Sequence, residues 1–79
     1  MKKNFEIDIL SQKSKKDIIT QKTIKATIQD DLLNFENYRF LQFKRNGIKS
    51  DFDFIYKNIR SVLNKKEHPF IIDIRISEV

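Results

Sequence analysis

The sequence contains no cysteine and no tryptophan, and it has only one glycine, one proline and one histidine. Without cysteine the chain can form neither a disulfide nor a zinc-thiolate site, and this absence fits a reducing compartment, so we expect a cytoplasmic protein. The single glycine, Gly47, excludes the glycine-rich loops that hold the phosphates of dinucleotides and nucleoside triphosphates. We therefore expect no cofactor of this kind.

Side chains suited to catalysis are equally scarce. His68 is the only histidine, so a serine- or cysteine-based triad would depend on this one imidazole, and a metal would find a single nitrogen ligand. The paired carboxylates Asp30-Asp31 and Asp51/Asp53 are better explained as a turn and as the acidic start of a helix. We expect a protein that is not an enzyme, holds no metal and acts by binding.

Long apolar runs are absent as well. No stretch reaches the roughly 18 apolar residues of a membrane-spanning helix. Met1 is followed by two lysines and an alternating segment instead of the apolar core of a signal peptide. We expect no contact with a membrane.

Size and charge set the remaining limits. The chain has 79 residues, with 16 Lys+Arg against 11 Asp+Glu and a net charge of +5. A single domain of this length buries only about 60% of its unfolded surface, which favours a homodimer. The positive charge favours a polyanionic partner, although the excess of lysine over arginine also fits AT-rich coding.

Regular alternation of apolar and polar residues predicts the first and last strands. Residues 4–10 read NFEIDIL and residues 70–77 read FIIDIRIS. In both segments every second residue is apolar, as in a strand with one buried face. In the last strand this alternation places Ile71 on the outer face together with Asp73 and Arg75.

The segment between these strands begins with a polar loop over residues 11–17, SQKSKKD. Residues 18–29 are rich in β-branched side chains, and their second half alternates, which predicts a second strand. Residues 18–22 are either a separate piece or a bulged continuation of it. Residues 30–31, two aspartates, end the pattern as a turn or a cap.

Residues 32–45 are ambiguous, because their apolar positions scatter around a helical wheel while two adjacent apolar residues break the alternation. Aromatic enrichment favours a strand over residues 38–44. Leu33 and Phe35 would then enter the core from a preceding loop. A short helix over residues 32–43 is the alternative.

The clearest element is a helix over residues 51–65, which follows an Asn-Gly turn. Ser50 is a good N-cap, Asp53 completes a shortened capping box, and Pro69 prevents continuation. The residues expected on its buried stripe are Phe52, Ile55, Tyr56, Ile59, Val62 and Leu63. The order strand-strand-strand-helix-strand predicts a single α+β domain over residues 1–79. We expect a four-stranded, mainly antiparallel sheet with the helix on one face.

Two groups of cations are candidate phosphate contacts. The first comprises Lys13, Lys15 and Lys16 in the polar loop, continued along the second strand by Lys22 and Lys25, and the second comprises Lys44, Arg45 and Lys49 beside the Asn-Gly turn. A solubilising hairpin tip would also explain the first group. Tyr38, Phe40 and Phe43 lie near the second group, where rings could stack on bases, but they serve as well to fill the core.

Phe54 lies nearly opposite the predicted buried stripe of the helix, beside Lys57. The predicted fold therefore exposes it, and with Ile71 it forms a candidate interface for a second copy or a protein partner.

Two functions fit these observations. The first is a nucleic-acid-facing accessory protein, homodimeric, that sets its lysine loops against phosphates without much sequence specificity. The alternative is a protein-binding inhibitor or modulator, of phage or mobile-element origin, that docks on a host protein through Phe54 and exposed strand edges.

Overall fold

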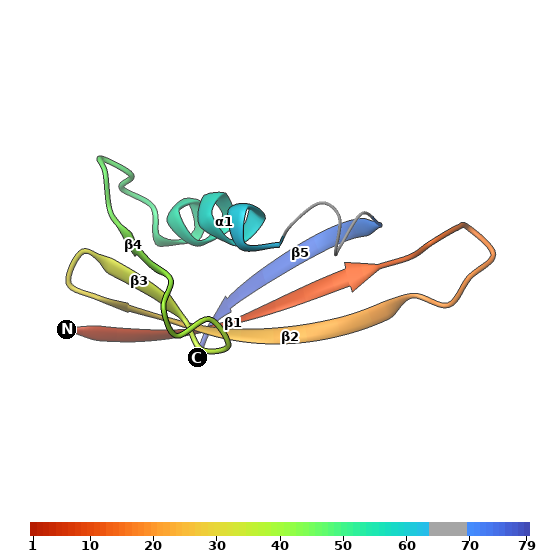
Figure 1. The fold of residues 1–79 in the computed structure, drawn as a ribbon, viewed down its shortest axis with the longest axis horizontal. Coiled ribbons are helices and arrows are strands. Elements are labelled where there is room, and N and C mark those ends of the chain that lie inside the picture. The colour runs from red at the N-terminus through yellow and green to blue at the C-terminus, as the bar shows by residue number, and fades with distance from the viewer. Residues whose placement is uncertain (64–69) are drawn as a thin grey trace.

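The computed structural model describes residues 1–63 and 70–79. Its elements are β1 (Lys2–Ser11), β2 (Thr20–Gln29), β3 (Leu32–Phe35), β4 (Gln42–Lys44), α1 (Asp51–Val62) and β5 (Ile71–Glu78). The strands form one antiparallel sheet in the order β4-β3-β2-β1-β5, and α1 lies across one face of it (Figure 1). The predicted α+β class is confirmed, but the sheet has five strands instead of four.

The extra strand comes from the segment that was ambiguous in the sequence. Gln29 pairs with Leu32, so the two aspartates form a two-residue hairpin turn in which Asp30 has a φ of 56°. This turn brings residues 32–35 directly beside β2, where pairing satisfies their backbone groups. The predicted loop there is therefore a strand, and the predicted strand over residues 38–44 shortens to β4. The alternative helix does not form.

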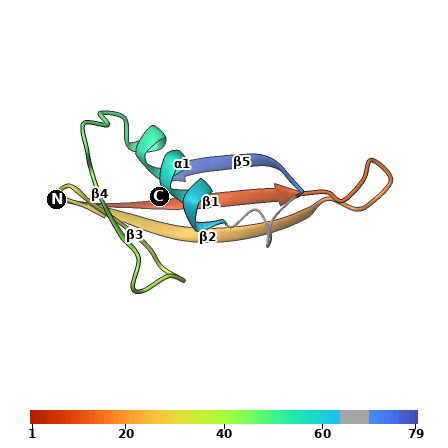
Figure 2. The same ribbon diagram turned by 45° about the horizontal axis from the view of Figure 1, so that its top comes forward.

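The hydrophobic core lies between α1 and the sheet. Alternation along β1 and β2 points one row of side chains from each strand toward the helix, and pairs such as Ile7 and Ile24 meet there. The buried residues are Phe5, Ile7, Ile9, Ile24, Ala26, Ile28, Leu33, Phe35, Phe54, Ile55, Ile59 and Leu63. In the part of the chain that the structure describes, the opposite face of the sheet carries no helix (Figures 1 and 2).

The structure corrects the prediction for Phe54, which is fully buried, whereas Phe52 is half exposed. Apolar residues occupy more than half of the helix circumference, so the sequence permits more than one buried stripe. In the fold the helix is turned so that Phe54 faces the core, and the ring of Phe52 lies at the rim against the edge of Phe5, with 6.0 Å between centroids. Phe54 cannot serve as an exposed interface residue.

The structure also corrects the prediction for Ile71. Leu10 pairs with Asp73, but Ser11 pairs with Ile71, so β5 contains one extra residue at a bulge. Ser11 belongs to the row of β1 that faces the helix. Ile71 therefore packs against the core instead of lying on the outer face. Counting every second residue fails across a bulge.

The predicted start of the helix is confirmed. The Ser50 side chain accepts a hydrogen bond from the Asp53 N–H at 3.4 Å. The predicted end at Lys65, together with His68 and Pro69, lies outside the residues that the structure describes. No helix within the described ranges is long and apolar enough to cross a bilayer.

Candidate nucleic-acid interface

The hairpin formed by β1 and β2 projects from one end of the molecule. The two strands pair from Lys2 with Gln29 to Ser11 with Thr20, whereas β3 pairs only with the stretch of β2 from Ala26 onward. At the opposite end the hairpin extends past β3, and β5 runs beside β1 as far as Ser11, so the loop that connects β1 to β2 projects beyond both strands (Figure 1). The molecule has a long axis of 43 Å. We call residues 11–22 the hairpin arm.

The arm carries Lys13, Lys15, Lys16 and Lys22, all of them exposed. Asp17 is the only acidic residue in the arm. Among the residues that the structure describes, none of these lysines forms an ion pair. As far as the described residues go, the arm is thus a predominantly positive region at the end of the molecule.

Hydrogen bonds hold the loop of the arm in shape. The Gln12 side chain donates to the Asp17 carbonyl at 2.9 Å, and the Asp17 N–H donates to the Ser14 carbonyl at 3.1 Å. The Gln12 N–H donates to the Phe70 carbonyl at 3.0 Å, which ties the base of the arm to the start of β5. These bonds use backbone and amide groups, so the ammonium groups remain available to a ligand.

Two apolar side chains lie beside these lysines. Ile18 is 86% exposed and Ile19 is half exposed. Sequence reasoning assigned both to a separate piece or to a bulged continuation of the second strand, and it did not treat them as functional. The signal was present in their adjacency, because two neighbouring apolar residues cannot both face the same buried side of a strand.

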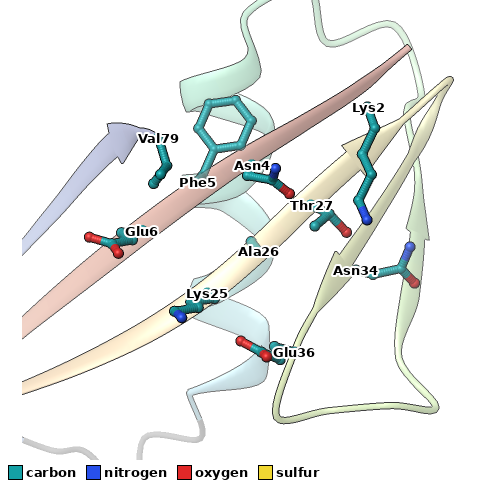
Figure 3. Close-up of a pocket in the computed structure, with 10 residues that line it drawn as sticks. All are labelled: Lys2, Asn4, Phe5, Glu6, Lys25, Ala26, Thr27, Asn34, Glu36 and Val79. Carbon is teal, nitrogen blue, oxygen red and sulfur yellow. The ribbon is translucent and has the colours of Figure 1, made fainter.

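Lys22 and Lys25, which were predicted to continue the loop lysines along the second strand, lie on opposite faces of the sheet. Lys22 lies in the row of β2 that faces the helix side, and Lys25 lies on the opposite, open face, because they are three residues apart in one strand. Lys25 pairs with Glu6, and the Glu36 N–H donates to the Lys25 carbonyl at 2.9 Å. Figure 3 shows Lys25 between these two carboxylates. Lys25 is therefore not part of the arm.

The open face holds a shallow depression of about 440 Å³ around these residues (Figure 3). Its lining mixes lysine, glutamate, asparagine and threonine side chains. The one aromatic residue that borders it, Phe5, is buried and packs against Phe52 on the helix side. This face consequently has neither the one-sided charge nor the stacking rings of a nucleic-acid-binding sheet.

The second group of cations lies near the other end of the sheet. Lys44 and Lys49 are exposed, but the side chain of Arg45 is only 18% exposed. Its guanidinium donates to the Ile48 carbonyl at 2.8 Å and lies 4.8 Å from the centre of the Phe54 ring. Arg45 is occupied by the fold and is not available to a phosphate.

Asp51 completes this internal network. It accepts hydrogen bonds from Arg45 and, at 3.0 Å, from Lys3. The Arg45 guanidinium, followed by the Lys3 ammonium, lowers the pKa of Asp51 from its ordinary value of 3.8. The same contact with Asp51 raises the pKa of Lys3. The network ties the start of α1 to β1 and to the end of β4.

The other candidate residues fall in separate places. Lys57 is exposed on α1, whereas Tyr38 and Phe43 pack against the core. Phe40 is 98% exposed in the loop that leads to β4. In the described ranges, no group of three acidic or histidine side chains is placed to hold a metal ion.

Comparison with protein-family models, with curated protein sequences and with solved structures finds no match to this chain. Its function is therefore inferred from its own residues.

Proposed function

We propose that this protein binds nucleic acid through the hairpin arm, with the arm lysines against the phosphate backbone. The observation that carries this proposal is a projecting loop with three lysines, followed by Lys22 in β2, beside two exposed isoleucines. Among the described residues none of these lysines has an ion-pair partner. The major groove of a duplex admits a two-stranded ribbon, and lysines at the tip of such a ribbon neutralise phosphates.

The isoleucines give the arm a second mode of contact. Ile18 and Ile19 follow Lys16 after one intervening residue, Asp17, so phosphate contacts would bring apolar side chains to the groove. In several proteins that bind the minor groove, apolar side chains insert between neighbouring base pairs and partly unstack them. The arm contains no arginine and no aromatic ring, so we expect little discrimination between sequences.

The test measures how affinity for a labelled mixed-sequence duplex changes with salt, by fluorescence anisotropy. Three to four phosphate contacts give a slope of log K against log salt of about −3. The arm variant carries Lys13→Gln, Lys15→Gln and Lys16→Gln and should lose most of this slope. The control carries Lys44→Gln, Lys49→Gln and Lys57→Gln, which removes the same charge from exposed sites outside the arm.

The control variant should keep most of the wild-type slope. Equal losses in the two variants would show that overall basicity, and not the arm, drives binding. Absence of any anisotropy change at low salt and micromolar protein would refute nucleic-acid binding itself. An Ile18→Ser/Ile19→Ser variant should weaken binding without changing the slope, because it removes no charge.

A protein-binding function is the second candidate, and one observation favours it. Phe40 is almost fully exposed, with Leu41 partly exposed beside it. The buried Phe54 cannot play the part that the sequence indicated. A Phe40→Ser variant that keeps its nucleic-acid slope but loses a purified protein partner would establish this function instead.

A further inference from the structure

Strand β5 forms one edge of the sheet over its whole length of eight residues. In the described part of the chain, no strand pairs with its outer side. It contains neither glycine nor proline. The opposite edge, β4, is only three residues long and carries Lys44, as protected edges do. The β4 edge is therefore better protected against pairing with another strand than the β5 edge.

The hydrogen bonds to β1 show which backbone groups of β5 face outward. The Val79 N–H donates to the Asn4 carbonyl at 2.8 Å, and bonded and non-bonded pairs alternate along an antiparallel ladder. The backbone groups of Arg75 therefore face β1, whereas those of Ile74 and Ile76 face away from it. Outward N–H and C=O groups are ready to pair with another strand.

Apolar side chains in β5 are incompletely covered. Ile72 is 52% exposed, and Ile74 and Ile76 are only partly buried against the core. The helix α1 lies beside β5 (Figure 2), and its Phe52 and Tyr56 are also exposed. A strand added to β5 would cover part of the isoleucine surface as well as the free backbone groups.

The sequence of β5 is complementary to itself in the antiparallel direction. When Ile74 of one copy faces Ile74 of another, Asp73 lies opposite Arg75 on both sides of this pair, and all of these residues belong to the regular part of β5 that follows the bulge. Opposite charges on directly facing residues stabilise a strand pair, as do facing β-branched residues. The registers one residue away instead place two aspartates or two arginines face to face. Charge alone therefore selects the register centred on Ile74.

We infer that β5 is a self-association surface through which two copies pair as antiparallel strands centred on Ile74. The two five-stranded sheets become one continuous sheet with both helices on the same side. This symmetric arrangement places each Asp73 carboxylate against the Arg75 guanidinium of the second copy. The inference is independent of what the hairpin arm binds.

The test uses sedimentation equilibrium of the full chain and charge-reversal variants. The wild type should sediment at twice the chain mass of 9.5 kDa at high micromolar concentration. Asp73→Arg and Arg75→Asp each create two facing like-charge pairs. Each variant alone should dissociate at least about tenfold more readily than the wild type.

An equimolar mixture of these two variants should regain the mass of a dimer. One copy then supplies two arginines and the other two aspartates, so both facing pairs are attractive again. Arg75 also contacts Asp73 within one chain at 3.0 Å. That contact is lost in either variant and stays lost in the mixture, so recovery of mass reports on pairing between chains alone. A mixture that stays monomeric would overturn the register.

A control at the opposite edge, Lys44→Glu, should leave the mass unchanged. Hydrogen exchange supplies a second measurement, in which the outward Ile74 N–H gains protection as protein concentration rises. The Arg75 N–H, which faces β1, should be protected at every concentration. A wild type that sediments at a single chain mass, or an Ile74 N–H whose exchange ignores concentration, would overturn the inference.

Discussion

Two loops in this protein carry cationic side chains that differ in their exposure to solvent. Residues 12–19 join β1 to β2 and contribute three exposed lysines. Residues 45–50 join β4 to α1 and contribute Arg45, which is folded against the core. Both read in the sequence as polar, positively charged turns. They differ in which groups lie within reach once the chain is folded.

The difference follows from side-chain chemistry and from neighbours. A guanidinium has five donors in one plane, so Arg45 can bond two backbone carbonyls and Asp51 while it covers the ring of Phe54. Lysines carry a compact ammonium that gains little from a single contact and stays hydrated. The arm offers them one aspartate and no ring. A cationic side chain in a loop therefore either stabilises the fold or stays exposed to solvent, and the groups that pack beneath it decide which.

The largest expected effect comes from removing the ring beneath Arg45. Phe54→Ala should lower the free energy of unfolding by about 3–5 kcal/mol, because it leaves a cavity in the core. The matched change in the arm, Ile18→Ala, should alter it by less than about 0.5 kcal/mol, because Ile18 is exposed. Urea denaturation followed by circular dichroism measures both. Equal effects would contradict the assignment of Phe54 to the core.

The second-largest effect is expected from removing the guanidinium of Arg45. Arg45→Ala should destabilise the fold by roughly 2–3 kcal/mol, because it leaves the Asp51 carboxylate with one partner fewer and uncovers Phe54. Lys15→Ala in the arm should leave stability within about 0.5 kcal/mol of the wild type. In the anisotropy assay the order should reverse, with the lysine variant the weaker binder. An Arg45 variant that is stable and binds poorly would make this residue functional.

Substitutions that act on the backbone of the two loops should change the free energy of unfolding by a smaller amount. Gly47 has a φ of 77°, and nothing lies within 4 Å of the position of an added Cβ. Gly47→Ala should therefore cost about 1 kcal/mol through backbone strain alone. Ser14→Ala in the arm should cost much less. The difference between their denaturation midpoints checks this, and equal midpoints would show that the β4–α1 connection relaxes freely.

The smallest effect is a dependence on pH. Because Arg45 and Lys3 lower the pKa of Asp51, its carboxylate stabilises the fold fully above pH 3.8. This stabilisation is lost as the pH falls through the lower pKa of the folded state. Asp51→Asn should therefore show a shallower loss of unfolding free energy below pH 3.8 than the wild type. Urea denaturation of both proteins at a series of acidic pH values measures this difference, and identical pH dependence in the two would exclude a role for Asp51.

Local patterns in the sequence predicted much of the fold correctly. Clean alternation located β1, the second half of β2 and most of β5, and Ser50 marked the start of α1. Each of these signals is contained in a few neighbouring residues. The exposure of Lys13, Lys15 and Lys16 also follows from a local pattern, because a loop without apolar residues gains nothing from burial.

The misjudged positions depended on contacts between different elements of the fold. Whether Phe54 or Phe52 faces inward depends on how the helix is turned over the sheet, and the apolar composition of the helix permits both. The side of Ile71 depends on a bulge whose partner, Ser11, is sixty residues away in the chain. Arg45 reads as a free cation until Asp51 and Phe54 are placed beside it.

The sequence by itself determined the α+β class, the location of three strands and the helix, and the scarcity of catalytic side chains. Periodicity and composition carry this information because they act over a few residues. Only the tertiary structure decided that the sheet has a fifth strand, that Arg45 is internal whereas the arm lysines are exposed, and that β5 ends the sheet with alternate backbone groups outward. These properties arise when segments far apart in the chain compete for the same buried face, and no local pattern records the outcome.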